Sequence, residues 1–157
     1  MPATLTRTRV LIADDHPLIR LAVRRELEDA GFEVCGEAAD SDGAVADALA
    51  AGPDLCLIDV QMPGGGVEAV RRIKGRLPET KVLMLTSSED EVDLVEAMLA
   101  GASGFLGKES EPARLPHVLR AVLRGEVVVP RAFISVLVQR MGAASEPRAG
   151  AAVPKTR

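Results

Sequence analysis

The chain has 157 residues, of which 27% are charged, and a formal net charge of −4. This length suits a single domain, and the mildly acidic balance gives no electrostatic signal for nucleic-acid or membrane-surface binding by the whole chain. No apolar run approaches the roughly 20 residues of a membrane span, and residues 1–9 lack the apolar stretch of a signal peptide. We therefore expect a cytoplasmic protein without membrane contact.

Short apolar runs alternate with amphipathic stretches along the chain. The predicted strands lie at 10–14, 32–38, 55–59, 81–86 and 104–107. The predicted helices lie at 19–30, 41–51, 67–74, 91–100 and 115–124. Gly75 and Pro78 are expected to end the third helix, and Ser88 with Glu91 forms a capping box before the fourth. Pro116 requires the fifth helix either to begin near Leu115 or to be kinked.

Five strand-then-helix repeats predict a doubly wound α/β fold, a parallel sheet with helices on both faces. In such sheets, ligands bind at the carboxyl ends of the strands. Polar residues stand at four of these ends: Asp14 and Asp15, Asp59, Thr86 and Ser87, and Lys108. Three carboxylates meeting at one edge either raise a pKa or take up a cation, and all-oxygen ligands with several waters suit Mg²⁺.

This set of residues carries a resemblance to a known family. Asp-Asp-His-Pro follows the first strand, Asp59 ends the third, and Gly-Ala-Ser-Gly-Phe-Leu-Gly-Lys surrounds the last. The combination resembles the receiver domain of bacterial two-component response regulators, and its motifs are most similar to those of the NarL/FixJ (LuxR-type) branch. The resemblance covers about residues 8–125 and implies a flavodoxin-like (CheY-like) five-stranded sheet of order 2-1-3-4-5. That order separates Cys35 from Cys56 by one strand, which argues against a disulfide between them.

The resemblance also implies roles for particular residues. Asp59 would accept a phosphoryl group from a histidine kinase, and Asp14, Asp15, Asp59 and the backbone carbonyl of Gln61 would hold Mg²⁺. The residues implied to bind the phosphoryl group or to respond to it are Thr86, Ser87, Lys108 and Phe105. The chain would then be a phosphorylation-controlled switch rather than an enzyme, although one that assists its own phosphotransfer and dephosphorylation.

Structural alternatives exist for several of these residues. Asp14 and Asp15 could simply cap the first helix, whose N-terminus favours negative charge, and Lys108 could be an ordinary solvated lysine. The Thr86 hydroxyl could serve only to hydrogen-bond the backbone at a strand end. His16 beside the acidic pair is interpreted as structural. The loop at 64–66 consists of three glycines and is one residue shorter than is usual in this branch.

The sequence beyond residue 125 is interpreted as a separate segment. Residues 1–125 would form the receiver, 126–141 an apolar linker helix and 142–157 a disordered tail. The DNA-binding helix-turn-helix domain of the branch is absent, so the chain would be either a fragment that contacts DNA only through a missing domain or a stand-alone receiver acting through protein–protein interaction. We expect 133–141 to pack on the receiver or to pair two chains as a homodimer.

Two functions from other classes remain as rivals. A Mg²⁺-dependent phosphatase with an aspartyl nucleophile usually has a second Asp two residues on, where Gln61 stands here. A flavin-binding electron carrier on the same fold needs a Ser-, Thr- and Gly-rich phosphate loop after the first strand, where residues 14–17 carry two carboxylates that would repel the phosphate.

Overall fold

The protein is built on a five-stranded parallel sheet of order β2-β1-β3-β4-β5, as seen in a computed structural model that describes residues 7–86, 91–108, 110–131, 133–135, 138, 139 and 142. The strands are β1 (Arg9–Ala13), β2 (Glu33–Ala38), β3 (Leu55–Asp59), β4 (Lys81–Thr86) and β5 (Gly104–Gly107). The helices are α1 (Pro17–Asp29), α2 (Ser41–Ala51), α3 (Gly66–Arg76), α4 (Glu91–Ala100) and α5 (Leu115–Leu123). The predicted fold class and strand order are confirmed.

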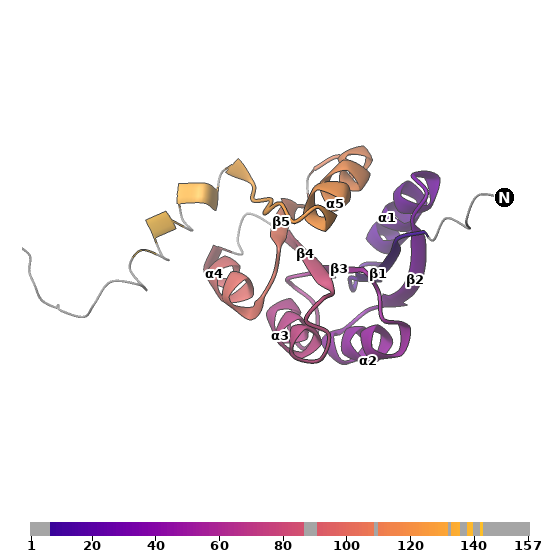
Figure 1. The fold of residues 1–157 in the computed structure, drawn as a ribbon, viewed down its shortest axis with the longest axis horizontal. Coiled ribbons are helices and arrows are strands. Elements are labelled where there is room, and N and C mark those ends of the chain that lie inside the picture. Colours follow the sequence, from indigo (N-terminus) through magenta and orange to yellow (C-terminus); the bar gives the residue numbers. More distant parts are fainter. Residues whose placement is uncertain are drawn as a thin grey trace, which may run out of the picture.

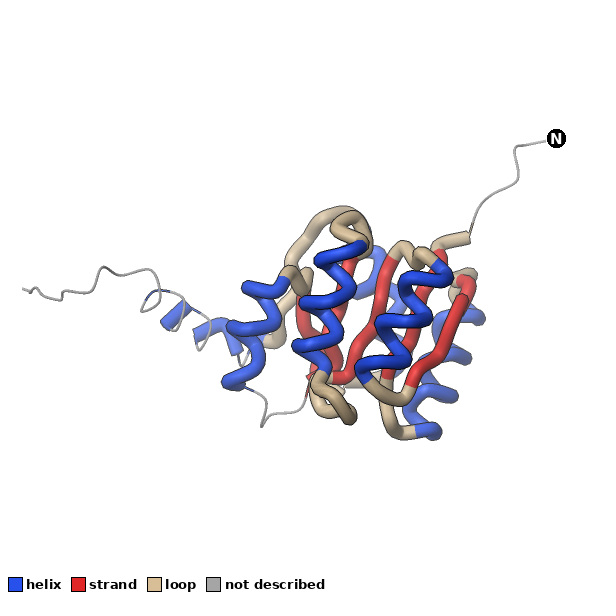
Figure 2. Tube along the Cα trace, turned by 90° about the horizontal axis from the view of Figure 1, so that it is seen from below, coloured by secondary structure: helices blue, strands red, loops and turns tan. Residues whose placement is uncertain are grey.

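Helices cover both faces of the sheet (Figure 1), and the turned view shows α2, α3 and α4 side by side across one of them (Figure 2). Helices α1 and α5 cover the other face, where Val23, Leu27 and Leu119 pack against one set of strand residues. The remaining strand residues pack beneath α2, α3 and α4, in a cluster that includes Val70 and Leu94. All five residues of β3 are buried, because this central strand has a helical layer on each face.

The helix ends follow from local sequence, with one correction. Asp40 caps α2 by accepting a hydrogen bond from the Gly43 N–H, and Gly52 closes that helix in the left-handed conformation. The prediction that Gly75 ends α3 is wrong: the helix continues to Arg76, and its C-cap is Leu77, whose N–H donates to the Ile73 carbonyl. An isolated glycine inside a helix weakens it without breaking it, and it is Pro78 that prevents further extension.

Two other local predictions concern α4 and α5. Helix α5 begins at Leu115 after a 3₁₀ turn at Pro112–Arg114, so the late start is confirmed and Pro116 lies in the first turn, where a missing N–H costs little. Ser88, the expected cap of α4, lies outside the described residues.

The two cysteines are free, and β1 lies between the strands that carry them. Burial raises the pKa of the Cys56 thiol to about 12, so it stays protonated and unreactive at neutral pH. In the part of the chain that the structure describes, no helix is long and apolar enough to span a membrane.

The segment after α5 differs from the predicted linker helix. Residues 126–130 are not helical, and Val128 instead forms a parallel bridge with Gly104. Helical residues begin at Arg131 and recur at 133–135, 138, 139 and 142. Pro130 explains the late start, because the residue before a proline is disfavoured in the helical conformation. Of the tail predicted to be disordered, residues 143–157 lie outside the described residues, so that interpretation stays a prediction.

Candidate functional site

Asp59 ends the buried central strand at the carboxyl edge of the sheet, and its side chain is fully buried. The Gln61 N–H donates to Asp59 Oδ1 at 3.0 Å, which fixes one carboxylate oxygen. The Val60 N–H donates to the Leu85 carbonyl at 2.9 Å and ties the following turn to β4. The Asp59 side chain is thereby held at the sheet edge, with Oδ2 left to face the neighbouring strand ends.

The turn after β1 brings a second carboxylate to the same place. The Asp14 N–H donates to the Ala38 carbonyl, and the Asp14 side chain is fully buried, whereas the side chain of Asp15 is 35% exposed. His16 Nδ1 lies 2.9 Å from Asp14 Oδ1, 3.0 Å from Asp15 Oδ1 and 4.0 Å from Asp59 Oδ2. Ligand atoms of these four residues lie within 4.8 Å of one another, so the predicted acidic cluster exists.

Lys108 reaches this cluster from the end of β5. Its Nζ donates to Asp59 Oδ2 at 3.1 Å and lies 3.5 Å from Asp14 Oδ2. Its backbone N–H donates to the Thr86 carbonyl at 2.8 Å, so the lysine is anchored to β4. Burial disfavours the ammonium, but the hydrogen bond to Asp59 and the attraction of both carboxylates outweigh it and raise the pKa of Lys108. The side chain is therefore a permanent positive charge at this site.

The surroundings disfavour the charged form of Asp59, whereas they favour the charged form of Lys108. Burial raises the pKa of Asp59, and repulsion from Asp14 adds to this effect. The hydrogen bonds from the Gln61 N–H and the Lys108 ammonium work against burial without cancelling it. The charged carboxylate is thus under-compensated, and a bound cation would relieve the site.

The donor set fits a hard divalent cation. Asp14 Oδ2 is buried and, among the described residues, has no hydrogen-bond partner, although the Lys108 ammonium lies 3.5 Å away. Buried carboxylate oxygens without a partner are rare, because leaving one unsatisfied is costly. Carboxylates from Asp14, Asp15 and Asp59 are the ligands that Mg²⁺ prefers. The participation of the Gln61 carbonyl stays a prediction.

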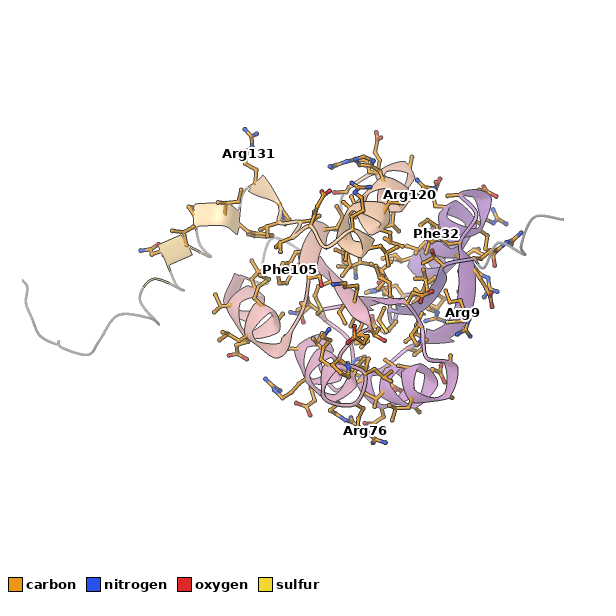
Figure 3. The ribbon with its side chains drawn as sticks, viewed as in Figure 1. Arg9, Phe32, Arg76, Phe105, Arg120 and Arg131 are labelled. Carbon is orange, nitrogen blue, oxygen red and sulfur yellow. The ribbon has the colours of Figure 1, made fainter. Side chains whose placement is uncertain are left out.

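Thr86 and Phe105 lie on neighbouring strands, under α4. Thr86 ends β4 opposite Gly107, and Phe105 lies opposite Met84; both Thr86 and Phe105 are fully buried. Since side chains alternate along a strand, Thr86 points to the same face of the sheet as Met84 and therefore as Phe105. Figure 3 labels Phe105 between β5 and α4. Ser87, the other predicted phosphate-site residue, lies outside the described residues.

The three-glycine loop beside Asp59 is tightly held. Gly64 and Gly65 have φ of 85° and 86°, a conformation that residues with a side chain rarely adopt. A Cβ on Gly66 would fall well inside contact distance of the Asp59 carbonyl oxygen and 2.8 Å from the Val60 Cα. The Gly66 N–H donates to the Val60 carbonyl at 3.0 Å. The short loop therefore folds directly back on the strand end that presents Asp59.

Two further residues contact the site: Arg20, which the sequence analysis did not name, and His16, which it interpreted as structural. His16 contacts both Asp14 and Asp15, and Arg20 donates from Nη1 to the Asp14 carbonyl at 2.6 Å. Arg20 also lies 3.4 Å from Glu37 on β2. The signal was present, because His16 and Arg20 are four residues apart across the start of α1 and therefore share a face near Asp14.

The geometry agrees with what comparison with known proteins shows. Residues 10–120 match the response regulator receiver domain. The chain belongs to this family. It is 40% identical over 124 residues to the transcriptional regulatory protein YxjL of Bacillus subtilis, covering 78% of this chain and 57% of that protein. The chain thus spans little more than half the length of this relative.

Solved structures place the receiver in the LuxR (NarL) branch. A LuxR-family response regulator from Aurantimonas is similar with a TM-score of 0.78 and 31% identity, over 87% of this chain and 99% of that one. The isolated receiver of RcsB from Salmonella enterica, solved in the presence of the phosphomimetic BeF₃⁻, is similar with a TM-score of 0.73 and 26% identity, over 84% of this chain and 99% of that one. The predicted family and branch are confirmed.

Proposed function

We propose that this receiver takes a phosphoryl group from a histidine kinase onto Asp59, in the presence of Mg²⁺, and changes conformation as a result. The observation that carries the proposal is the buried Asp59 carboxylate with the Lys108 ammonium 3.1 Å from Oδ2 and Asp14 beside it. A nucleophilic oxygen, a fixed positive charge and a cation-binding carboxylate then meet at one point. Phosphoryl transfer depends mainly on such positioning and charge neutralisation.

The proposed step transfers one phosphoryl group from a histidine nitrogen to an Asp59 oxygen. An Asp59 oxygen attacks the phosphorus of a phosphohistidine, the P–N bond breaks as a P–O bond forms, and the departing imidazole takes up a proton. Lys108 stabilises negative charge on the phosphoryl oxygens, and the Thr86 hydroxyl donates a hydrogen bond to one of them. Asp14, Asp15, Asp59 and the Gln61 carbonyl would hold Mg²⁺, which supplies further charge neutralisation when bound.

The output is a shift between two conformations rather than turnover of a substrate. Driving a protein from mostly inactive to mostly active requires about 5.5 kcal/mol of differential stabilisation. New hydrogen bonds from Lys108 and Thr86 to the phosphoryl group would supply part of it, and Phe105 would move with Thr86. We propose that this response takes place in the cytoplasm and controls a DNA-binding domain outside this chain. We also propose that it involves pairing of two receivers.

The test is intact-mass spectrometry after incubation with acetyl phosphate and Mg²⁺. We expect the wild type to gain the mass of one phosphoryl group and Asp59→Asn to gain none. Asp54→Asn is the matched control, because Asp54 immediately precedes the same strand at its opposite end. Equal phosphorylation of Asp59→Asn, or continuous phosphate release from simple phosphomonoesters without a stable adduct, would contradict the proposal.

A further inference from the structure

His16 stands at the start of helix α1, but its side chain does not stabilise that helix end. It is the N-cap residue, with φ of −99° and ψ of 108°, and its side chain makes no capping hydrogen bond to the described first turn of α1. Histidine is also not among the residues preferred at this position. The imidazole lies instead beside the carboxylates that follow β1 and end β3. Capping of α1 therefore does not explain this side chain.

The Nδ1 atom of His16 lies among the oxygens of three carboxylates. It is 2.9 Å from Asp14 Oδ1 and 3.0 Å from Asp15 Oδ1. It is 4.0 Å from Asp59 Oδ2. With metal–ligand bonds of about 2.1 Å, adjacent ligand atoms of an octahedral ion lie about 3.0 Å apart and opposite ones about 4.2 Å. The imidazole nitrogen therefore has the spacing of a further ligand in a shared metal site.

An independent observation indicates that a cation belongs between these groups. Asp14 is fully buried, and its Oδ2 has no hydrogen-bond partner among the described residues. The Lys108 ammonium faces the same cluster, 3.5 Å from Asp14 Oδ2 and 3.4 Å from His16 Nδ1. Three carboxylates and one ammonium leave the cluster with two net negative charges, which a bound dication would balance.

A nitrogen ligand changes which metals such a site prefers. Mg²⁺ binds oxygen ligands and water, so an imidazole adds little to its affinity. Among first-row transition metals, sites that contain nitrogen bind more tightly along the series from Mn²⁺ through Co²⁺ to Cu²⁺. The His16 side chain is 56% exposed, so the ring can adjust toward an entering ion without disturbing the core.

We propose that His16 is a ligand of this metal site, and that it strengthens the binding of first-row transition-metal dications without strengthening the binding of Mg²⁺. The inference rests on the metal site of the proposed function but does not require phosphoryl transfer. The carboxylates bind either class of ion through oxygen, whereas the His16 Nδ1 adds a bond only for a metal that accepts imidazole. The choice of metal in this receiver then depends on a residue outside the acidic set.

The experiment compares Co²⁺ with Mg²⁺ binding to the full chain by isothermal titration calorimetry at neutral pH. We expect His16→Asn to lower the Co²⁺ affinity about tenfold or more and the Mg²⁺ affinity less than about threefold. His16→Ala should show the same pattern, and it excludes compensation by the asparagine amide. His117→Asn is the matched control, because His117 is the other histidine of the chain and lies exposed on α5.

Proton NMR of the Co²⁺-loaded protein tests ligation directly, because paramagnetic Co²⁺ shifts the ring protons of a bound imidazole far from their usual range. We expect such signals from the wild type and His117→Asn and none from His16→Asn. If His16→Asn binds Co²⁺ as tightly as the wild type, or loses Co²⁺ and Mg²⁺ affinity equally, the inference is overturned and the proposed function stands. If Co²⁺ binds through His16 but BeF₃⁻ does not bind in the presence of Mg²⁺, the proposed function falls and this inference stands.

Discussion

Two buried carboxylates share one ammonium at the centre of the site. Asp14 and Asp59 are both fully buried, and Lys108 Nζ is 3.5 Å and 3.1 Å from their Oδ2 atoms. A single positive charge cannot balance two negative ones in a region from which water is excluded. The residual negative charge would favour a divalent cation at this site, and it makes the stability of the fold depend on the ionisation of Asp59.

Replacing Lys108 by glutamine tests the role of its charge. Hydrogen bonds to charged groups contribute roughly 1.5–3 kcal/mol, so we expect Lys108→Gln to weaken BeF₃⁻ binding by about tenfold or more. Isothermal titration calorimetry in saturating Mg²⁺ measures this. Lys81→Gln is the control, because Lys81 begins β4 at the far edge of the sheet. Equal affinities for wild type and Lys108→Gln would contradict the assignment.

The raised pKa of Asp59 predicts a pH-dependent stability. Because burial raises the folded pKa above that of the unfolded chain, ionisation of Asp59 opposes folding. This contribution to stability is therefore present below the ordinary Asp pKa of about 4 and is lost as pH rises through the folded value. Without metal, Asp59→Asn should melt at a higher temperature than the wild type at pH 7, and the gap should close at low pH.

Thermal unfolding followed by circular dichroism measures this difference. Adding Mg²⁺ at pH 7 should raise the melting temperature of the wild type far more than that of Asp59→Asn, because the cation binds only where the carboxylates are intact. A wild type that is the more stable of the two at pH 7 without metal would show that the Lys108 pairing outweighs burial.

At the scale of elements, local patterns predicted interiors better than ends. The alternation of buried runs and amphipathic stretches was enough to find strands β1 to β5 and helices α1 to α5. Gly75 was misread because a glycine in the last turn of a helix has the same appearance in sequence as a glycine just beyond it. The helix expected from residue 126 starts later for two reasons. Pro130 disfavours the helical conformation just before it, which the sequence could have shown, and Val128 pairs with Gly104, a contact between distant residues that no local pattern reports.

The two glycines of α3 give opposite predictions. Gly66→Ala would force the loop beside Asp59 apart, and overpacking of this kind costs about 1–3 kcal/mol. Gly75→Ala meets nothing within 4 Å and should stabilise the protein by about 0.5–1 kcal/mol, since alanine favours the helix interior. Urea unfolding measures both. Similar effects of the two substitutions would contradict the account of the short loop.

Helix α1 presents an exposed apolar pair beside the acidic cluster. Leu18 is 80% exposed and Leu21 is 46% exposed, next to a cavity of about 110 Å³ lined by Ile19, Leu106 and Pro112 among others. Under the proposed function, we expect a phosphohistidine protein to contact this surface when it approaches Asp59, because α1 begins directly after Asp14, Asp15 and His16. Leu18→Ser should therefore slow phosphorylation by a cognate kinase about tenfold while leaving phosphorylation by acetyl phosphate unchanged. Leu99→Ser on α4 is the control, and an equal loss with both donors would argue against docking.

At the scale of the whole molecule, the site was predictable because the sheet topology brings its residues together. Parallel strands place their carboxyl ends at one edge, so Asp14, Asp59 and Lys108 had to meet once the strands were ordered. The balance of charge among them was not predictable, since it depends on burial and on distances of a few tenths of an ångström. Arg20 was not predicted, although its position four residues after His16, across the start of α1, places the two residues on one helix face.

The most direct measurement is a crystal structure of the chain with Mn²⁺ in place of Mg²⁺ and with BeF₃⁻. The account predicts one anomalous peak bound by Asp14 or Asp15 and Asp59, with BeF₃⁻ on an Asp59 oxygen in contact with the Lys108 ammonium and the Thr86 hydroxyl. A metal bound away from these carboxylates, or BeF₃⁻ that contacts neither Lys108 nor Thr86, would contradict it.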